Sequence, residues 1–307
     1  MVQSTSGQSM SGQSTSGQST SGNVLPPSIF DEKAHIQRLN RAHKLGFANF
    51  LLRRAEDELN ERLTSILRNF DTVADIGTPL PIFSQKLAGG TDASNFKYLS
   101  PENFLQDADR PLPLKTAYFS LIVSAMALHA VNDLPGTFVQ IRRALRPDGL
   151  FMACIPGGRT LNELRTVLQI AEEEITGGIS PRVFPFADIK DFGILLQRAG
   201  FKLPVTDVDT VTVRYNNMYA LMHDLRKMGA TNILRSRLNY PTRRSVFERA
   251  SELYIKKFSD SDGRIKSTFE FIWVSGWAEH ESQRKPLKPG SAKQKLADVL
   301  QKYSHKD

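Results

Sequence analysis

Apolar residues recur at two different spacings along this chain, and these spacings predict alternating helices and strands. From Asp31 to about Phe70 they recur every three or four residues, which is typical of one buried helix face. That face contains Leu52, Ala55, Leu59, Leu63, Ile66 and Phe70. Asp31 has the side chain of an N-cap residue, and we expect Gly46 to divide the segment into two helices.

Short, nearly continuous apolar runs predict buried strands. These runs are 72–76, 118–126 and 150–155, with later strand-like runs at 201–205, 208–215 and 267–277. Helical patterns separate them at 134–145, 160–175, 186–199, 217–228 and 244–258. Strands that alternate with helices predict an α/β fold with parallel strands and helical crossovers.

Local motifs predict where several of these elements begin and end. The run Thr160-Leu161-Asn162-Glu163 has the form of a capping box, and Gly177-Gly178 is expected to end its helix. Arg146-Pro147-Asp148-Gly149 is expected to be a turn, because Pro and Gly occupy the positions that turns favour. A short helix is expected at 83–87.

The carboxyl ends of the predicted parallel strands mark one candidate site. Ligands of such sheets bind beyond these ends, near the point where the strand order reverses. That rule places residues 75–77, 107–109, 124–129 and 156–159 around a single cleft.

The loop after the first strand departs from the usual nucleotide-binding turn. Such turns use glycines so that the backbone can approach the ligand and direct N–H groups at it. Here the sequence after Asp75-Ile76-Gly77 is Thr78-Pro79-Leu80-Pro81. Proline has no N–H and a fixed φ angle, so ordinary nucleotide binding by this loop is in doubt.

Two side chains near the cleft are candidates for chemistry. His129 follows a buried strand and could act as a general base or hydrogen-bond anchor, and the alternative is a packing or capping histidine. Arg159 follows two glycines and could bind a carboxylate, and the alternative is an ordinary strand-to-helix loop. Tyr215, Tyr219 and Met222 either belong to a lid over the cleft or pack in the core.

The charge and cysteine content narrow the classes of function. The 307-residue chain carries a net charge of +8 and has a pI near 9.5, but its basic residues are scattered without interleaved aromatic residues. We therefore expect no specific nucleic-acid partner, while attraction to acidic partners or to an anionic membrane surface fits the charge. The single cysteine, Cys154, lies in an apolar run and is expected to be a core residue, with a nucleophile as the alternative.

The two ends of the sequence differ in composition from the rest. Residues 3–22 are four near-copies of one Gln/Ser/Gly-rich pentad, so 1–24 is expected to be a disordered tail. Residues 281–307 form a basic C-terminal tail, and 25–280 form the folded domain. No apolar run reaches the ~18 residues of a membrane span, and the tail lacks the features of a signal peptide, so we expect a cytoplasmic protein.

Several motifs resemble one family. The chain is similar to class I S-adenosylmethionine-dependent methyltransferases, in the branch of the mitochondrial complex I assembly factor described as an arginine hydroxylase and its alphaproteobacterial relatives. This branch is related to the biotin-pathway carrier-protein methyltransferase. The more specific motifs are Asn132-Asp133-Leu134-Pro135 and the run from Gly157-Gly158 to Glu163-Leu164-Arg165, and the likeness covers about 25–292.

The resemblance implies a fold and a cofactor. The expected fold is a doubly wound, Rossmann-like methyltransferase sheet with an N-terminal helical segment and a helical lid, at about 216–260, before the last strand. S-adenosylmethionine is the implied cofactor, and Pro79 and Pro81 stand where the family has its second and third glycines. The positions implied to bind the cofactor are Asp75, Gly77, Asp92, Asp109 and Ser124. The distance from Asp75 to the fourth strand is short, so the second strand or its helix is expected to be missing.

The resemblance also implies two readings of function. In the first, the chain is a methyltransferase-like protein with a degenerate cofactor loop, acting on a protein such as a respiratory complex I subunit. In the second, it is a non-catalytic or repurposed assembly protein on the same fold. Arginine hydroxylation, as in the nearest branch, would need iron or another oxidant, and the sequence offers no convincing facial triad of His and carboxylate ligands.

Overall fold

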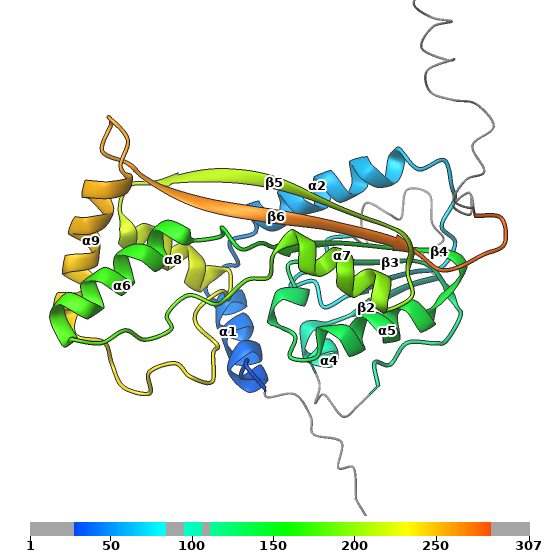
Figure 1. Ribbon diagram of the computed structural model, residues 1–307, viewed down its shortest axis with the longest axis horizontal. Coiled ribbons are helices and arrows are strands. Elements are labelled where there is room, and N and C mark those ends of the chain that lie inside the picture. Colours follow the sequence, from blue (N-terminus) through cyan, green and yellow to red (C-terminus); the bar gives the residue numbers. More distant parts are fainter. Residues whose placement is uncertain (1–27, 84–94, 106–110, 284–307) are drawn as a thin grey trace, which may run out of the picture.

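A six-stranded sheet forms the centre of the molecule, with strand order β2-β1-β3-β4-β6-β5. The computed structural model describes residues 28–83, 95–105 and 111–283 (Figure 1). The strands are β1 (Val73–Ile76), β2 (Phe96–Leu99), β3 (Phe119–Ala125), β4 (Leu145–Pro156), β5 (Lys202–Tyr215) and β6 (Ile265–Trp277). The fold is α/β and doubly wound, as the sequence predicted.

The direction of the strands places the reversal of strand order between β1 and β3. Strands β2, β1, β3 and β4 are parallel, whereas β6 lies antiparallel between β4 and β5. From β1 the chain goes to β2 on one side and then crosses to β3 on the other. The carboxyl ends of β1 and β3 are therefore the expected ligand-binding edge.

The N-terminal segment forms the two predicted helices, α1 (Glu32–Lys44) and α2 (Phe50–Thr64). Asp31 caps α1 by accepting the N–H of Ala34 at 3.0 Å. Gly46 lies between the helices with φ of 79°, a conformation that favours glycine. The second helix ends six residues before Phe70, so the predicted boundary was too late.

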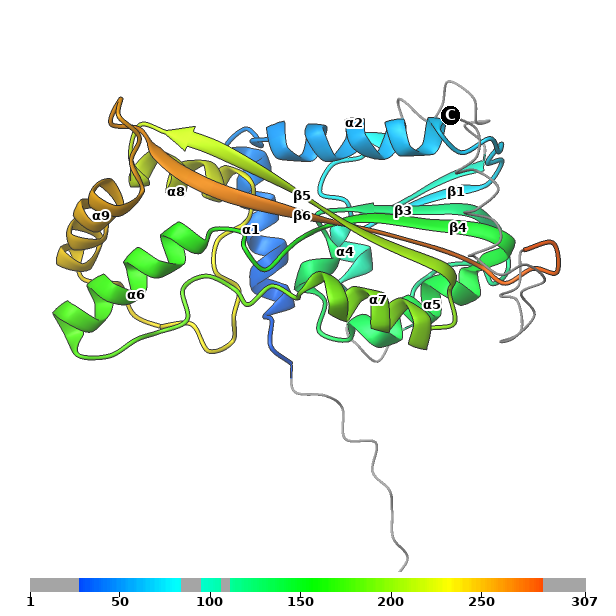
Figure 2. The same ribbon diagram turned by 45° about the horizontal axis from the view of Figure 1, so that its top comes forward.

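Helices cover both faces of the sheet and create two apolar cores (Figure 2). Successive β3 residues point to opposite faces, with Leu121 and Val123 in one core and Ile122 in the other. Helix α2 packs on the first face, and α5 (Leu134–Ala144) and α7 (Ile189–Arg198) pack on the second. Because both faces are covered, the central strands β1 and β3 are buried along their whole length and mainly apolar, as their sequence indicated.

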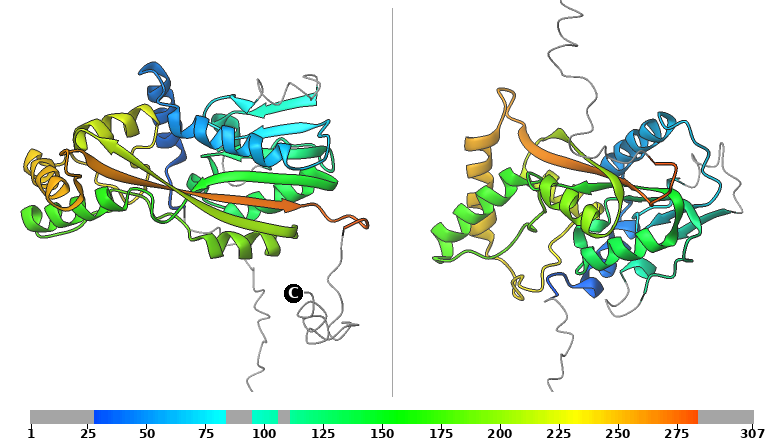
Figure 3. Two further views of the ribbon diagram at one scale, coloured as in Figure 1. Left: turned by 90° about the horizontal axis from the view of Figure 1, so that it is seen from above. Right: turned by 45° about the vertical axis from the view of Figure 1, so that its right-hand side comes forward.

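The β5–β6 ribbon extends beyond the rest of the sheet (Figure 3). Strand β4 pairs with β6 only along 271–277, whereas β5 pairs with β6 as far as Tyr215 and Ile265. Helices α6 (Asn162–Thr176), α8 (Met218–Lys227) and α9 (Arg244–Phe258) share an apolar core with this overhanging part. The two predicted runs at 201–215 are thus one long strand.

The predicted capping box at Thr160 is wrong. The helix begins at Asn162, its N-cap residue is Leu161, and no side chain caps it. The Thr160 hydroxyl instead donates to the carbonyl of Glu270 and accepts its N–H, both at 3.1 Å. Glu163 accepts the N–H of Thr268 at 3.0 Å. Thr160 and Glu163 thus form hydrogen bonds with β6 instead of capping the helix. Gly177, with φ of 73°, ends α6 as predicted.

The second strand, which was expected to be missing, is present as β2, between β1 and β3 in the sequence. Asp92 precedes this strand and therefore does not lie at its carboxyl end. Strand β2 pairs in parallel with β1, and the short helix α4 (Pro101–Phe104) follows it. Asp92 and Asp109 lie outside the described residues, as does the predicted helix at 83–87 apart from Phe83.

The remaining predicted boundaries change little. The expected turn at 146–149 belongs to the start of β4, where Asp148 has φ of 62°. Among the described residues, no helix is long and apolar enough to cross a membrane.

Candidate functional site

A cavity of about 480 Å³ lies where the carboxyl ends of the sheet meet the helices around the ribbon. Its walls come from α1, α2, α6, α8 and the segment 182–186, and they are mainly apolar. The polar groups that line it include His35, His129, Thr160, Arg182 and Glu270. A mainly apolar cavity of this size with a few polar groups is typical of a ligand or substrate site.

His129, predicted from sequence, lines this cavity from a short 3₁₀ helix, Leu128–Ala130. Its ring stacks on Phe184 with centroids 5.9 Å apart, and Phe186 lies 6.1 Å away. Burial, and secondarily the nearby His35, lowers the pKa of His129 to about 3. The imidazole is therefore neutral near pH 7, and its buried Nδ1 has no hydrogen-bond partner among the described residues.

His35, on α1, lines the same cavity and was not identified from the sequence. Burial, together with the charge of Arg38, lowers its pKa to about 4. Its buried Nδ1 also lacks a partner within the described part of the chain. The available signal was its place on the buried face of α1 with Ala34 and Leu39, where a histidine is unusual.

Arg159, the second predicted catalytic residue, does not line the large cavity. Its side chain is 72% exposed, and its Nε lies 4.0 Å from Oε2 of Glu270. Its backbone N–H donates to Oε1 of the same carboxylate at 3.2 Å. The structure therefore places Glu270, rather than Arg159, in the cavity wall.

The glycines before Arg159 have two different roles. A Cβ on Gly157 would lie 2.4 Å from Oε1 of Glu270 and 2.8 Å from Cγ1 of Ile272. Gly157 thus makes room for β6, not for a ligand. A Cβ on Gly158 would meet nothing closer than 3.8 Å.

Asp75 and Ser124, two of the predicted cofactor-binding residues, are fully buried between β1 and β3. One oxygen of Asp75 accepts the hydroxyl of Thr78, and the other has no partner among the described residues. Burial raises the pKa of Asp75 to about 8, although the bond from Thr78 opposes this shift. The hydroxyl of Ser124 donates to the carbonyl of Ile76 at 2.8 Å and joins the two strands.

Gly77, the third, has φ of 72° and so keeps the conformation that the family motif requires. The ring of Phe104 covers it, because a Cβ on Gly77 would lie 2.4 Å from Cδ1 of that ring. The hydroxyl of Tyr98 also donates to the carbonyl of Thr78 at 2.7 Å. Of this loop, Pro79 lines the large cavity.

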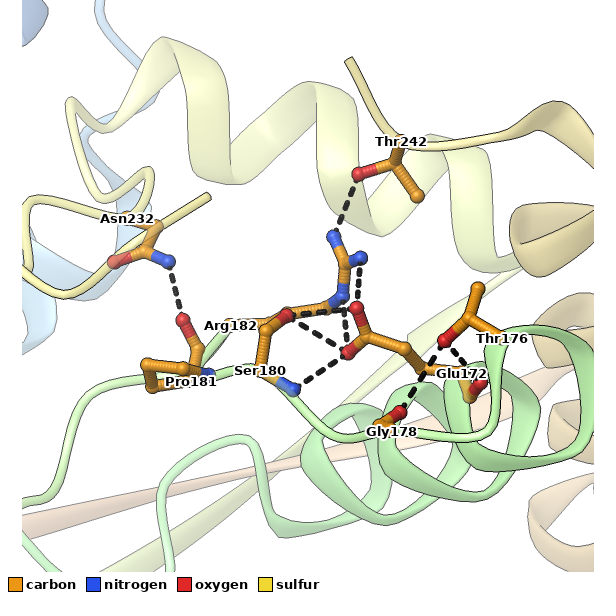
Figure 4. A network of polar contacts seen from close by, with 8 residues as sticks. All are labelled: Glu172, Thr176, Gly178, Ser180, Pro181, Arg182, Asn232 and Thr242. Carbon is orange, nitrogen blue, oxygen red and sulfur yellow. Dashed lines mark hydrogen bonds and ion pairs between the residues drawn. The ribbon is translucent and has the colours of Figure 1, made fainter. Parts of the chain in front are cut away.

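Arg182, which lines the cavity, is held by a largely buried ion pair with Glu172 (Figure 4). Arg182 donates to both carboxylate oxygens of Glu172 on α6, at 3.0 and 2.6 Å. Ser180 adds hydrogen bonds from its N–H and its hydroxyl, and Arg182 also reaches Thr242 at 2.7 Å. Burial raises the pKa of Glu172, but its hydrogen bonds with Arg182 and Ser180 outweigh that effect and leave the pKa lowered.

The described residues offer few groups for covalent or metal chemistry. Burial raises the pKa of the Cys154 thiol well above its usual value, which suits the predicted core position. No group of three or more His, Cys, Asp or Glu side chains within the described ranges could hold a metal ion.

A comparison with protein families identifies a methyltransferase domain at residues 88–153, which include β2, β3 and most of β4. The fold and this match define a methyltransferase-domain protein of the α/β class.

Comparison with individual proteins narrows the assignment of this chain from a domain class to one family. The human mitochondrial arginine-hydroxylase NDUFAF5 is 35% identical over 257 residues, which cover 80% of this chain and 74% of that protein. The Dictyostelium discoideum NDUFAF5 is 44% identical over 180 residues, which are 58% of this chain and 41% of that protein. A malonyl-[acyl-carrier protein] O-methyltransferase from Xylella fastidiosa is 35% identical over 55% of each chain. The chain belongs to the NDUFAF5 family, as the motifs predicted.

The first loop does not fit S-adenosylmethionine in the manner of its glycine-rich relatives. Pro79 and Pro81 offer no N–H, and Phe104 covers the one remaining glycine, Gly77. Asp75 is 0% exposed. In the described part of the chain, the groups that would hold the cofactor are therefore enclosed by the protein itself.

Proposed function

We propose that this chain is a methyltransferase-like protein with a degenerate cofactor loop, and that it acts on a protein substrate, a subunit of respiratory complex I. The observation that carries the proposal is the cavity of about 480 Å³ beyond the carboxyl ends of the sheet. It can accept one side chain of a protein segment, and membership of the NDUFAF5 family supports such a substrate.

Three polar groups of the cavity suit a side chain that donates hydrogen bonds, although the donors Arg182 and Arg226 also line it. His129 and His35 are neutral and can accept hydrogen bonds, and Glu270 supplies a carboxylate that is only 8% exposed. Desolvation strengthens each of these contacts. Thr160 and the N–H of Arg159 hold Glu270 in position.

S-adenosylmethionine is the cofactor that the family implies, and its methyl group would be the group transferred. The enclosure of Asp75 and Gly77 supports weak cofactor binding by this chain. The same enclosure favours one second candidate function, that of a non-catalytic assembly protein that binds its partner through the cavity.

We also propose a cytoplasmic location, for which the support is that no apolar run in the sequence reaches the ~18 residues of a membrane span. The curated relatives in the family are named as mitochondrial proteins. A fluorescent fusion in the native cell, viewed beside a membrane marker, tests this proposal and its peripheral-membrane alternative.

A binding assay with purified complex I subunits tests the proposed substrate. Met222→Trp would fill the cavity from α8, whereas Ile255→Trp adds the same group on a 50% exposed position of α9. We expect one subunit to bind the wild type and the Ile255 variant, and to bind the Met222 variant at least about tenfold more weakly, a loss of about 1.4 kcal/mol.

Two outcomes of that assay would contradict the proposal. One is that no subunit binds the wild type. The other is that the Met222 and Ile255 variants bind equally well. Mass spectrometry of the bound subunit after incubation with S-adenosylmethionine then separates the two candidate functions, because only the enzyme adds mass to the subunit.

A further inference from the structure

A second cavity, of about 420 Å³, is also lined by residues of the segment 181–186. Gly158, Arg165 and Gln169 line it together with this segment. Arg182, Val183 and Phe186 line both cavities, so the two are neighbours. Arg165 ends the specific sequence motif that begins at Gly157, and none of the functions above uses it.

Arg165 brings a positive charge to this cavity, and no carboxylate of the described residues forms an ion pair with it. It is half-buried on α6, and one Nη donates to the carbonyl of Phe184 at 3.0 Å. Burial alone lowers the pKa of Arg165, with no acidic group acting in the opposite direction. A guanidinium has five N–H donors, so this single hydrogen bond leaves most of them available.

The acidic side chains near Arg165 on α6 are already engaged. Glu172 accepts from Arg182 and from Ser180, as Figure 4 shows. Glu163 accepts the N–H of Thr268. The described residues that line the second cavity include no Asp or Glu.

The neighbours of Arg165 suit an anionic group. Gln169 lies one helical turn further along α6, on the same side, and its amide can donate a second hydrogen bond. Gly158 leaves space, because an added Cβ would meet nothing closer than 3.8 Å. Arginine and an amide side by side can hold both oxygens of a carboxylate.

We propose that the second cavity is an oxyanion site, and that Arg165 and Gln169 bind there the carboxylate of an acidic residue in the protein substrate. Because the two cavities share a wall, this acidic residue lies close in sequence to the one that enters the large cavity. The site adds to the proposed function the requirement that the protein substrate has an acidic residue. The inference rests on that function only for the source of the carboxylate.

Binding of a small probe to the full chain tests the site without a protein substrate. The probe is N-acetylglutamate amide, which carries one side-chain carboxylate. The readout is the backbone N–H signal of Gly158, which lines the cavity, in the chain labelled with nitrogen-15 glycine; it is assigned by its loss in Gly158→Ala and is present in every variant tested. We expect a saturable shift for the wild type and at least about tenfold weaker binding for Arg165→Gln.

Matched variants make the result specific. Arg142→Gln removes the same charge from α5, where Arg142 is also half-buried and donates only to the carbonyl of Gly200 among the described contacts. We expect it to bind the probe like the wild type. Gln169→Ala, at an exposed position, should bind several-fold more weakly and keep the fold.

Three results would overturn the inference. The first is a wild-type signal that does not shift with the probe. The second is an equal loss of binding in the Arg142 and Arg165 variants. The third is inorganic phosphate binding at least about tenfold more tightly than the carboxylate probe, because phosphate would then be the natural ligand. Failure of the subunit-binding assay would not alter any of these readings.

Discussion

Asp75 is a buried carboxyl that remains in the cofactor motif although the loop after it is weakened for cofactor binding. It occupies the first position of the cofactor motif, yet it is 0% exposed and its one described partner is the hydroxyl of Thr78. Its raised pKa, about 8, means that the folded protein holds this proton near pH 7. Unfolding releases the proton, because the unfolded pKa lies near 3.8.

Replacement of this carboxyl should therefore change how stability depends on pH. Asp75 costs no stability below pH ~4, where both states are protonated, and an increasing amount as the pH rises towards 8. For Asp75→Asn, the free energy of unfolding relative to wild type should rise by about 1–3 kcal/mol between pH ~5 and pH ~8. Urea denaturation at several pH values measures this.

A control separates the effect of burial from that of charge. Glu281→Gln removes an exposed carboxylate and should leave the pH dependence unchanged. If Asp75→Asn is also independent of pH, Asp75 is ionised in the folded protein, and the enclosed site described above is incorrect.

At the scale of secondary-structure elements, the connection between β4 and α6 depends on close contact with β6. Thr160, Glu163 and Gly157 all adapt to β6 rather than to a helix end or a ligand. A side chain at Gly157 would collide with both Glu270 and Ile272.

Two alanine substitutions at adjacent glycines test this contact. Gly157→Ala should destabilise the fold by about 1–3 kcal/mol through overpacking. Gly158→Ala should change stability by less than about 0.5 kcal/mol, because its Cβ would be in ordinary contact. Chemical denaturation of both variants decides the matter, and equal stabilities would contradict the assigned role of Gly157.

Elements with a strong local pattern could be predicted from the sequence, and others could not. β1 and β3 are nearly continuous apolar runs, and α1 has a capping residue and a buried stripe. Strand β2 is only partly buried, so it carries little pattern. The predicted division of strand β5 fell at Thr206-Asp207, between two apolar runs, whereas the irregularity of the strand lies earlier, at Leu203, whose φ is 50°. A strand at the edge of a sheet tolerates such an irregularity.

The candidate site was predictable only where it follows a strand end. His129 comes directly after β3, so sheet topology placed it correctly in the cavity. His35 and Glu270 come from α1 and β6, which lie more than 200 residues apart in the chain. Only tertiary packing brings them together, and no local signal in the sequence records that contact.

At the scale of the whole molecule, the substrate half and the cofactor half of the candidate site differ in how open they are. The half formed by β4, β6 and the helices around the ribbon contains an open cavity. In the described part of the other half, Phe104 covers Gly77, the hydroxyl of Thr78 bonds to the buried Asp75, and Pro79 and Pro81 offer no backbone N–H. The central claim is therefore a retained substrate side beside a weakened cofactor side.

Calorimetry with S-adenosylmethionine and S-adenosylhomocysteine on the full chain tests this claim most directly. A second sample carries Pro79→Gly and Pro81→Gly, which restore two backbone N–H groups, together with Phe104→Ala, which uncovers Gly77. We predict no binding by the wild type tighter than a Kd of about 100 μM, and a gain in affinity for the variant. A wild-type Kd near 1 μM, or about −8 kcal/mol, would contradict the account.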